Sequence, residues 1–113
     1  MLKTLTQNYI DAFNSKNLKR ISEFLTDDFV LEDPVVKRIE GKDKALSAIN
    51  NIFTSCNNLE FTKRNIYQDN QTTFIEFILK LDDTVLTGID IIEWENNKMT
   101  ELRAYLDVPS AEN

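Results

Sequence analysis

The feature that most constrains the fold is a change of hydrophobic period at Cys56. Before this residue, apart from short stretches at 29–33 and 36–40, apolar side chains recur every three or four positions, which is typical of one face of a helix. After it, apolar and polar residues alternate almost to the end of the sequence, which is typical of half-buried strands. Helices followed by consecutive strands predict an α+β fold, with the helices packed on one face of a curved antiparallel sheet.

The helical part divides into three segments. The first runs from Leu2 to Phe13 and is broken by Asn14-Ser15-Lys16-Asn17. The second runs from Leu18 to Leu25 and stops near Thr26-Asp27-Asp28. The third follows Gly41 and carries an apolar face that ends at Cys56.

The strands are separated by clear turn signals. Phe29 to Asp33 alternates like a strand and is ended by Pro34, and Val36 to Glu40 is predicted to be a short companion strand. Four longer strands are predicted at 59–68, 72–82, 84–95 and 98–108. Tight turns are expected between these strands at Asp69-Asn70, Asp82-Asp83 and Asn96-Asn97.

Size and composition limit the classes of function. With 113 residues, the chain is expected to form one domain, residues 1–113. A net charge of −6 argues against nucleic acid or an anionic membrane as the main partner, because both require a basic surface. One cysteine cannot form an intramolecular disulfide, and Met1 leads directly into a charged amphipathic segment, so we expect a cytoplasmic protein without a leader or membrane span.

The absence of histidine is more decisive for the chemistry. It excludes Ser-His and Cys-His nucleophiles and histidine metal sites. Any acid–base chemistry must use carboxyls, tyrosine, lysine or water, and we expect neither a metal nor an organic cofactor.

Two aspartates stand on apolar strand faces. Asp33 shares a face with Phe29 and Leu31, although it could instead simply open the turn at Pro34. Asp90 lies within a strand, where aspartate is disfavoured. It is either a pocket carboxyl, with a pKa raised by its apolar surroundings, or one partner of a cross-strand salt bridge to Arg103.

Aromatic residues are the candidates for the walls of a pocket around these carboxyls. Tyr9 lies on the apolar stripe of the first helix, either as a core residue or as a hydrogen-bond donor. The other candidate wall residues would line a ligand pocket if they point inward, and would otherwise serve core or dimer packing: Phe29, Phe53, Phe61, Phe77, Trp94 and Tyr105.

The strand at 84–95 is apolar on both faces. Leu86 and Ile92 lie on one side, and Val85, Ile89 and Ile91 on the other. Helices can cover only one of these faces. We therefore expect a homodimer that covers the outer sheet face.

Two runs of residues carry a resemblance to a known family. The opening run from Tyr9 to Asn14, with Leu31-Glu32-Asp33-Pro34 and Gly41, resembles the start of the NTF2-like superfamily, also called SnoaL-like. The closing run from Gly88 to Trp94, with Leu102 to Asp107, looks like the last two strands of that superfamily. The resemblance implies a cone-shaped α+β barrel of three helices and a bent sheet, enclosing a pocket for a small hydrophobic ligand, and usually a dimer.

Within that superfamily, the chain is most similar to ketosteroid isomerase. The resemblance implies that Asp33 is the general base, and that Tyr9 and a protonated Asp90 stabilise the enolate oxygen. One departure is Ile49, which stands where that isomerase has a second tyrosine. Limonene epoxide hydrolase fits less well, because it has an arginine where this chain has Gly88. The alternative is a non-catalytic module that binds an apolar small molecule or serves dimerisation.

Overall fold

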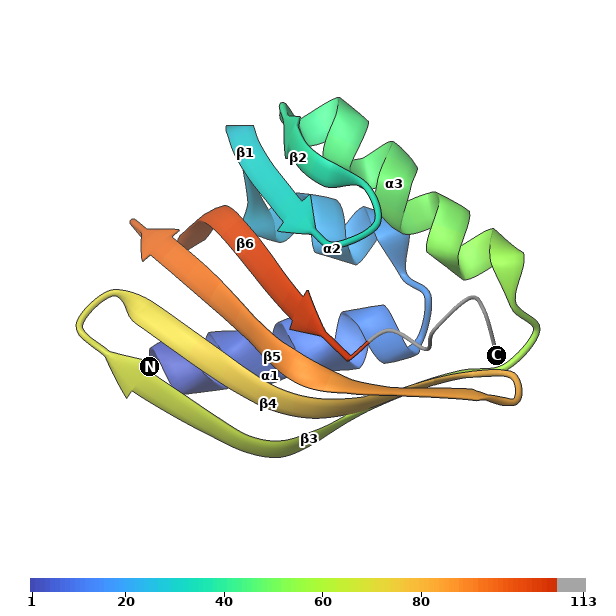
Figure 1. Ribbon diagram of the computed structural model, residues 1–113. Coiled ribbons are helices and arrows are strands. Elements are labelled where there is room, and N and C mark those ends of the chain that lie inside the picture. Colours follow the sequence, from blue (N-terminus) through green and yellow to red (C-terminus); the bar gives the residue numbers. More distant parts are fainter. Residues whose placement is uncertain (108–113) are drawn as a thin grey trace.

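A computed structural model describes residues 1–107 and shows three helices and six strands in the predicted order (Figure 1). The last position of the strand predicted at 98–108 lies outside the described residues. The elements are α1 (Leu2–Asn14), α2 (Leu18–Phe24), β1 (Leu25–Asp33), β2 (Lys37–Glu40), α3 (Lys42–Ser55), β3 (Leu59–Asp69), β4 (Thr72–Leu81), β5 (Thr84–Glu95) and β6 (Lys98–Leu106).

The six strands form one sheet in the order β2-β1-β6-β5-β4-β3. The predicted meander from β3 to β6 is confirmed, with each strand antiparallel to the next. One pair departs from the prediction, because β1 runs parallel to β6. These two strands are separated by most of the chain, so no hairpin fixes their direction. The sheet curves around the helices but does not close, since β2 and β3 remain as its edges (Figure 1).

The turns at Asp82-Asp83 and Asn96-Asn97 lie at the predicted positions, and the first turn lies at Asn70-Gln71, one residue later than predicted. Asn70, Asp82, Asn96 and Asn97 adopt positive φ angles of 55°, 55°, 52° and 64°. Short polar side chains tolerate this left-handed region better than most residues. The sequence therefore predicted the ends of β3, β4 and β5 to within one residue.

The boundary between α2 and β1 differs from the prediction. The helix ends at Phe24, and Leu25 already has extended backbone angles and pairs with Met99 of β6. Phe24 and Leu25 are both buried, so the hydrophobic pattern cannot tell the last helical residue from the first strand residue. As a result β1 begins without an intervening loop.

The core lies between the helices and the inner face of the sheet (Figure 1). A chain of hydrogen bonds between buried side chains crosses this core. The indole Nε1 of Trp94 donates to the hydroxyl of Thr73 at 2.9 Å, and that hydroxyl lies 2.8 Å from the hydroxyl of Thr6 on α1. The Thr6 hydroxyl also bonds the carbonyl of Leu2 at 2.8 Å. Every member has a partner, which is what buried polar groups require.

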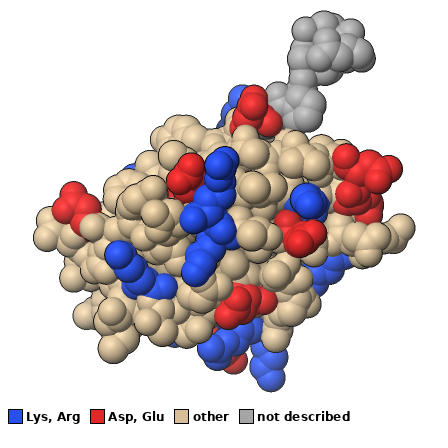
Figure 2. Space-filling model, turned by 90° about the horizontal axis from the view of Figure 1, so that it is seen from below, with Lys and Arg blue, Asp and Glu red and all other residues tan. Residues whose placement is uncertain are grey.

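In the part of the chain that the structure describes, no helix lies over the outer face of the sheet. On the side of the molecule seen in Figure 2, Lys and Arg side chains lie among Asp and Glu. Large apolar side chains also reach solvent on the outer face of the strands, among them Val85, Ile89 and Tyr105. Within residues 1–107, no helix is long and apolar enough to cross a membrane.

Candidate active site

A small, partly open cavity of about 70 Å³ lies between the helices and the inner face of the sheet. Its wall is largely apolar, and it contains three polar side chains, Tyr9, Asp33 and Asp90. These residues come from α1, from the end of β1 and from the middle of β5. The remaining lining residues are Phe13, Leu31, Ile49, Ile52, Phe61, Phe77, Leu79, Leu102, Ala104 and Leu106.

Asp90 is placed in the cavity by the alternation of β5. Its side chain is 5% exposed, on the same face as Leu86 and Ile92. Burial, and to a smaller extent the charge of Asp33, raises the pKa of the Asp90 carboxyl to about 8. Asp90 is therefore protonated at neutral pH and can donate a hydrogen bond.

The alternative of a salt bridge between Asp90 and Arg103 is contradicted by the strand register. Asp90 lies opposite Ala104, and Arg103 lies opposite Ile91. Successive side chains of a strand point to opposite faces, so Arg103 lies on the outer face. No cation offsets the cost of ionising Asp90 among the residues that line the cavity.

Asp33 both opens a turn and lines the cavity, so the two interpretations given for it from the sequence are both correct. Its Oδ1 accepts hydrogen bonds from the backbone N–H groups of Val35 and Val36, at 2.8 and 2.7 Å, and so it opens the turn after β1. The same carboxyl lines the cavity. The two backbone bonds fix the orientation of the carboxyl through one oxygen, which leaves Oδ2 available to a ligand.

Tyr9 lies on the inner face of α1, with 3% of its surface exposed. Burial, followed by the charge of Asp90, raises the pKa of the Tyr9 phenol well above its ordinary value. The phenol therefore stays neutral and keeps its proton for donation. Together the cavity holds two neutral O–H donors, Tyr9 and Asp90, and the carboxyl of Asp33.

The predicted aromatic wall is only partly formed by the predicted residues. Phe61 and Phe77 line the cavity. Phe29 and Phe53 are buried in the core beside it, and Trp94 points its indole N–H at Thr73 instead. These three do not belong to the lining set.

Tyr105 lies on the opposite side of the sheet and is 54% exposed. The prediction that it forms part of the pocket wall is therefore wrong. Leu102, Ala104 and Leu106 of β6 face the cavity, which turns Tyr105 outward by strand alternation. Ala104 was missed by sequence reasoning, although the register of the β5–β6 hairpin places it opposite Asp90.

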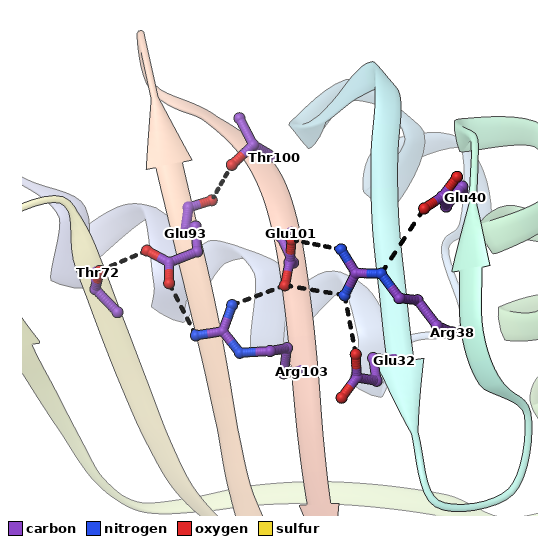
Figure 3. Close-up of polar contacts among 8 residues, drawn as sticks. All are labelled: Glu32, Arg38, Glu40, Thr72, Glu93, Thr100, Glu101 and Arg103. Carbon is purple, nitrogen blue, oxygen red and sulfur yellow. Dashed lines mark hydrogen bonds and ion pairs between the residues drawn. The ribbon is translucent and has the colours of Figure 1, made fainter.

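Sequence reasoning also missed an ion-pair network on the outer face (Figure 3). Arg103 bonds Glu93 and Glu101, each at 2.8 Å, and Arg38 of β2 bonds Glu32 at 2.9 Å and reaches Glu101 at 3.4 Å. Hydrogen bonds from Thr72 and then from Arg103 lower the pKa of Glu93. The network spans five neighbouring strands of the sheet, from β2 to β4.

A wider surface hollow of about 630 Å³ lies elsewhere, lined by residues that include Asp28, Glu95 and Glu101. It is an open polar groove, and neither Tyr9 nor Asp33 nor Asp90 lines it. Within residues 1–107, no group of acidic or cysteine side chains is arranged to hold a metal ion. The apolar cavity between the helices and the sheet is therefore the candidate site, because ionisable groups with shifted pKa values gather there.

Comparison with known families decides the classification. The family model of the SnoaL-like domain matches residues 6–102. The chain belongs to the SnoaL-like family. No curated protein matches the sequence of this SnoaL-like chain.

Solved structures support the same fold at low sequence identity. An NTF2-like protein of unknown function from Cytophaga hutchinsonii superposes with a TM-score of 0.83 at 14% identity, covering 95% of this chain and 90% of that one. A protein with a ketosteroid isomerase-like fold from Catenulispora acidiphila, in complex with trimethylamine, gives a TM-score of 0.79 at 11% identity, with coverages of 89% and 83%. An epoxide hydrolase from M. tuberculosis, similar to limonene epoxide hydrolase, gives 0.76 at 18% identity, with coverages of 92% and 80%. At these identities the SnoaL-like chain shares the fold with all three, and the fold hosts several functions.

Proposed function

We propose that this SnoaL-like protein is an isomerase-like enzyme that moves a proton alpha to the carbonyl of a small hydrophobic ketone, without a cofactor. One observation carries the proposal: Tyr9, Asp33 and Asp90 line the same apolar cavity. An acceptor carboxyl and two neutral donors around one largely apolar cavity are what enolisation of a carbon acid needs.

Asp33 acts as the general base in the proposed mechanism. Its Oδ2 removes a proton from the carbon beside the carbonyl, and the electron pair of that C–H bond forms the enolate. The proton then returns from Asp33 to the far end of the conjugated system, and the double bond shifts into conjugation. The turn amides of Val35 and Val36 hold the carboxyl through Oδ1, so the base is oriented before the substrate arrives.

Tyr9 and Asp90 stabilise the oxygen of the enolate. Both are neutral donors at neutral pH, because burial raises the pKa values of both. Hydrogen bonds from these groups to the carbonyl oxygen strengthen as negative charge develops on it, so they favour the transition state over the bound ketone. Epoxide hydrolysis is less well supported, since Gly88 stands two residues before Asp90 and no arginine lines the cavity.

The proposal is tested by following the conversion of cyclohex-3-enone to its conjugated isomer by ultraviolet absorbance. The wild-type protein should accelerate the conversion, and Asp33→Asn should lower kcat/KM by about 10² to 10⁴, the usual contribution of a general base. Glu93→Gln is the matched control, because Glu93 is a carboxyl on the outer face of the same sheet. No acceleration by the wild-type protein would contradict the proposal. Binding of phenol without turnover of the ketone would favour a non-catalytic binding module.

We also propose that the protein is a homodimer through the outer face of the sheet. Val85, Ile89, Tyr67 and Tyr105 expose 44–55% of their surface on strands that no helix covers. Large apolar side chains gathered on one sheet face are typical of an interaction surface. Ile89→Lys should shift the protein from dimer to monomer in sedimentation velocity, whereas Lys44→Glu on α3 should not. A wild-type monomer at high concentration would contradict this proposal.

A further inference from the structure

We infer that the cavity takes an uncharged carbonyl compound no larger than a single six-membered ring, and that a row of phenylalanine rings sets this limit. The inference rests on the proposed function and specifies its substrate class. The cavity measures about 70 Å³. Pockets for drug-sized ligands measure roughly 300–1,000 Å³, so a fused multi-ring compound exceeds the available space several-fold.

The row of rings consists of Phe53, Phe13, Phe61 and Phe77. The ring centroids of neighbours lie 5.1, 5.0 and 5.1 Å apart along this row, and Phe13 also meets Tyr9 at 6.0 Å. These spacings are those of packed aromatic pairs. All four rings are at least 93% buried. One ring cannot rotate away from the cavity without displacing the next, because interiors are close-packed.

Phe77 cannot retreat into the sheet. Its cross-strand partner is Gly88, and a Cβ placed on Gly88 would lie 3.1 Å from Cζ of the Phe77 ring. The ring therefore already rests against bare backbone of β5. The same Cβ would lie 2.3 Å from the backbone carbonyl oxygen of Tyr105, so the backbone of β6 also approaches Gly88 closely. The cavity wall at Phe77 is fixed by the backbone of the sheet.

The polar groups of the cavity restrict the charge of the ligand. Among residues 1–107, no lysine or arginine lines the cavity, whereas two carboxyls do. A ligand carboxylate or phosphate would have no cationic partner and would lie beside Asp33 and Asp90. A carbonyl oxygen, by contrast, can accept from both Tyr9 and Asp90. A compact uncharged ketone such as a cycloalkenone meets these conditions.

The size limit is tested with phenols, which mimic the enolate and can donate to or accept from the same groups. Phenol, 2-naphthol and equilenin present one hydroxyl on one, two and four fused rings. We expect calorimetric titration to detect phenol, with binding at least tenfold weaker for 2-naphthol and none for equilenin. Equal or tighter binding of the larger phenols would overturn the size limit and leave the proposed function intact. Failure of phenol itself to bind would overturn the proposed oxyanion site and the size limit with it.

Variants of strand β4 identify the ring that sets the limit. Phe77→Ala should raise the affinity for 2-naphthol relative to phenol at least tenfold, because it opens the wall. Phe74→Ala is the matched control, since Phe74 lies on the outer face of the same strand and does not line the cavity. If Phe77→Ala does not fold, Phe77→Leu should show a smaller change in the same direction. An unchanged ratio in a folded Phe77 variant would overturn the role of Phe77.

Discussion

Two of the carboxyls of strand β5, those of Asp90 and Glu93, lie on opposite faces of the sheet and differ in exposure, in hydrogen-bond partners and in pKa. Asp90 lies on the inner face, is 5% exposed and has a pKa raised to about 8. Glu93, three residues later, lies on the outer face, receives hydrogen bonds from Thr72 and Arg103, and has a lowered pKa. The same chemical group is thus a neutral donor on one face and a stable anion on the other.

The difference in pKa between Asp90 and Glu93 depends on which face of the sheet each residue occupies, and so on the strand register, not on the distance between them along the chain. Arg103 lies on the neighbouring strand β6, one position from the residue opposite Asp90. A shift of β6 by one residue against β5 would turn Arg103 to the inner face, on the same side as Asp90. The register therefore separates the cation from the buried carboxyl, and the shifted pKa of Asp90 depends on that separation.

The largest expected effect is on how the free energy of unfolding depends on pH. An unfolded aspartate loses its proton near pH 3.8, whereas folded Asp90 keeps it up to about pH 8. The folded state therefore binds more protons between these values, and the free energy of unfolding falls as the pH rises, by up to the order of 5 kcal/mol from this group. Asp90→Asn should remove this fall.

Chemical denaturation at pH 4, 6 and 9 measures the effect. At pH 9 the Asp90→Asn protein should be more stable than the wild type by about 2–5 kcal/mol, and at pH 4 the two should nearly agree. Glu93→Gln should give the opposite sign, because a lowered pKa contributes stability that is lost as the pH falls. Parallel curves for the wild type and Asp90→Asn would show that Asp90 ionises normally.

A smaller effect is expected in the pH profile of catalysis. Above about pH 8, Asp90 loses the proton that it donates, and its charge then opposes the charge on the enolate oxygen. We expect kcat/KM of the wild type to fall up to about tenfold per pH unit in this range. The amide of Asp90→Asn keeps its donor, so its profile should stay flat there. An identical fall in both proteins would assign the transition to another group.

The smallest effect is expected on the outer face. Arg103→Met removes two ion pairs of partly exposed residues, and such pairs contribute less than about 1 kcal/mol each. At low salt, the free energy of unfolding should fall by less than about 1 kcal/mol for each pair that is lost. At about 0.5 M salt the fall should be smaller, because dissolved ions screen the attraction between the paired charges. Isomerisation should be unchanged. A loss of activity similar to that of Asp33→Asn would mean that Arg103 acts on the inner face.

Most of the fold followed from the sequence because local signals agreed with one another. The switch from helical to alternating period specified the order of elements, and the Asx residues at positive φ specified the hairpins. The parallel pairing of β1 with β6 could not be read in this way. It depends on contacts between distant segments and leaves no periodic trace in either one.

The polar part of the candidate site was more predictable than its wall. A carboxyl on an apolar strand face is conspicuous, so Asp33 and Asp90 could be selected from their strands. Tyr105 was misplaced because an aromatic residue suits either face of a strand, and only the inward Ala104 and Leu106 decide its direction. Ala104 was overlooked because a small apolar residue gives no signal of its own.

The hydroxyl chain from Trp94 through Thr73 to Thr6 has a practical consequence. Trp94 is the single tryptophan of the sequence, and its indole reaches α1, the helix that carries Tyr9, through two threonine hydroxyls. It does not line the cavity. Its fluorescence should therefore report whether α1 is docked, independently of whether a ligand is bound. The protein thus contains an optical probe that separates loss of the helix from loss of the ligand.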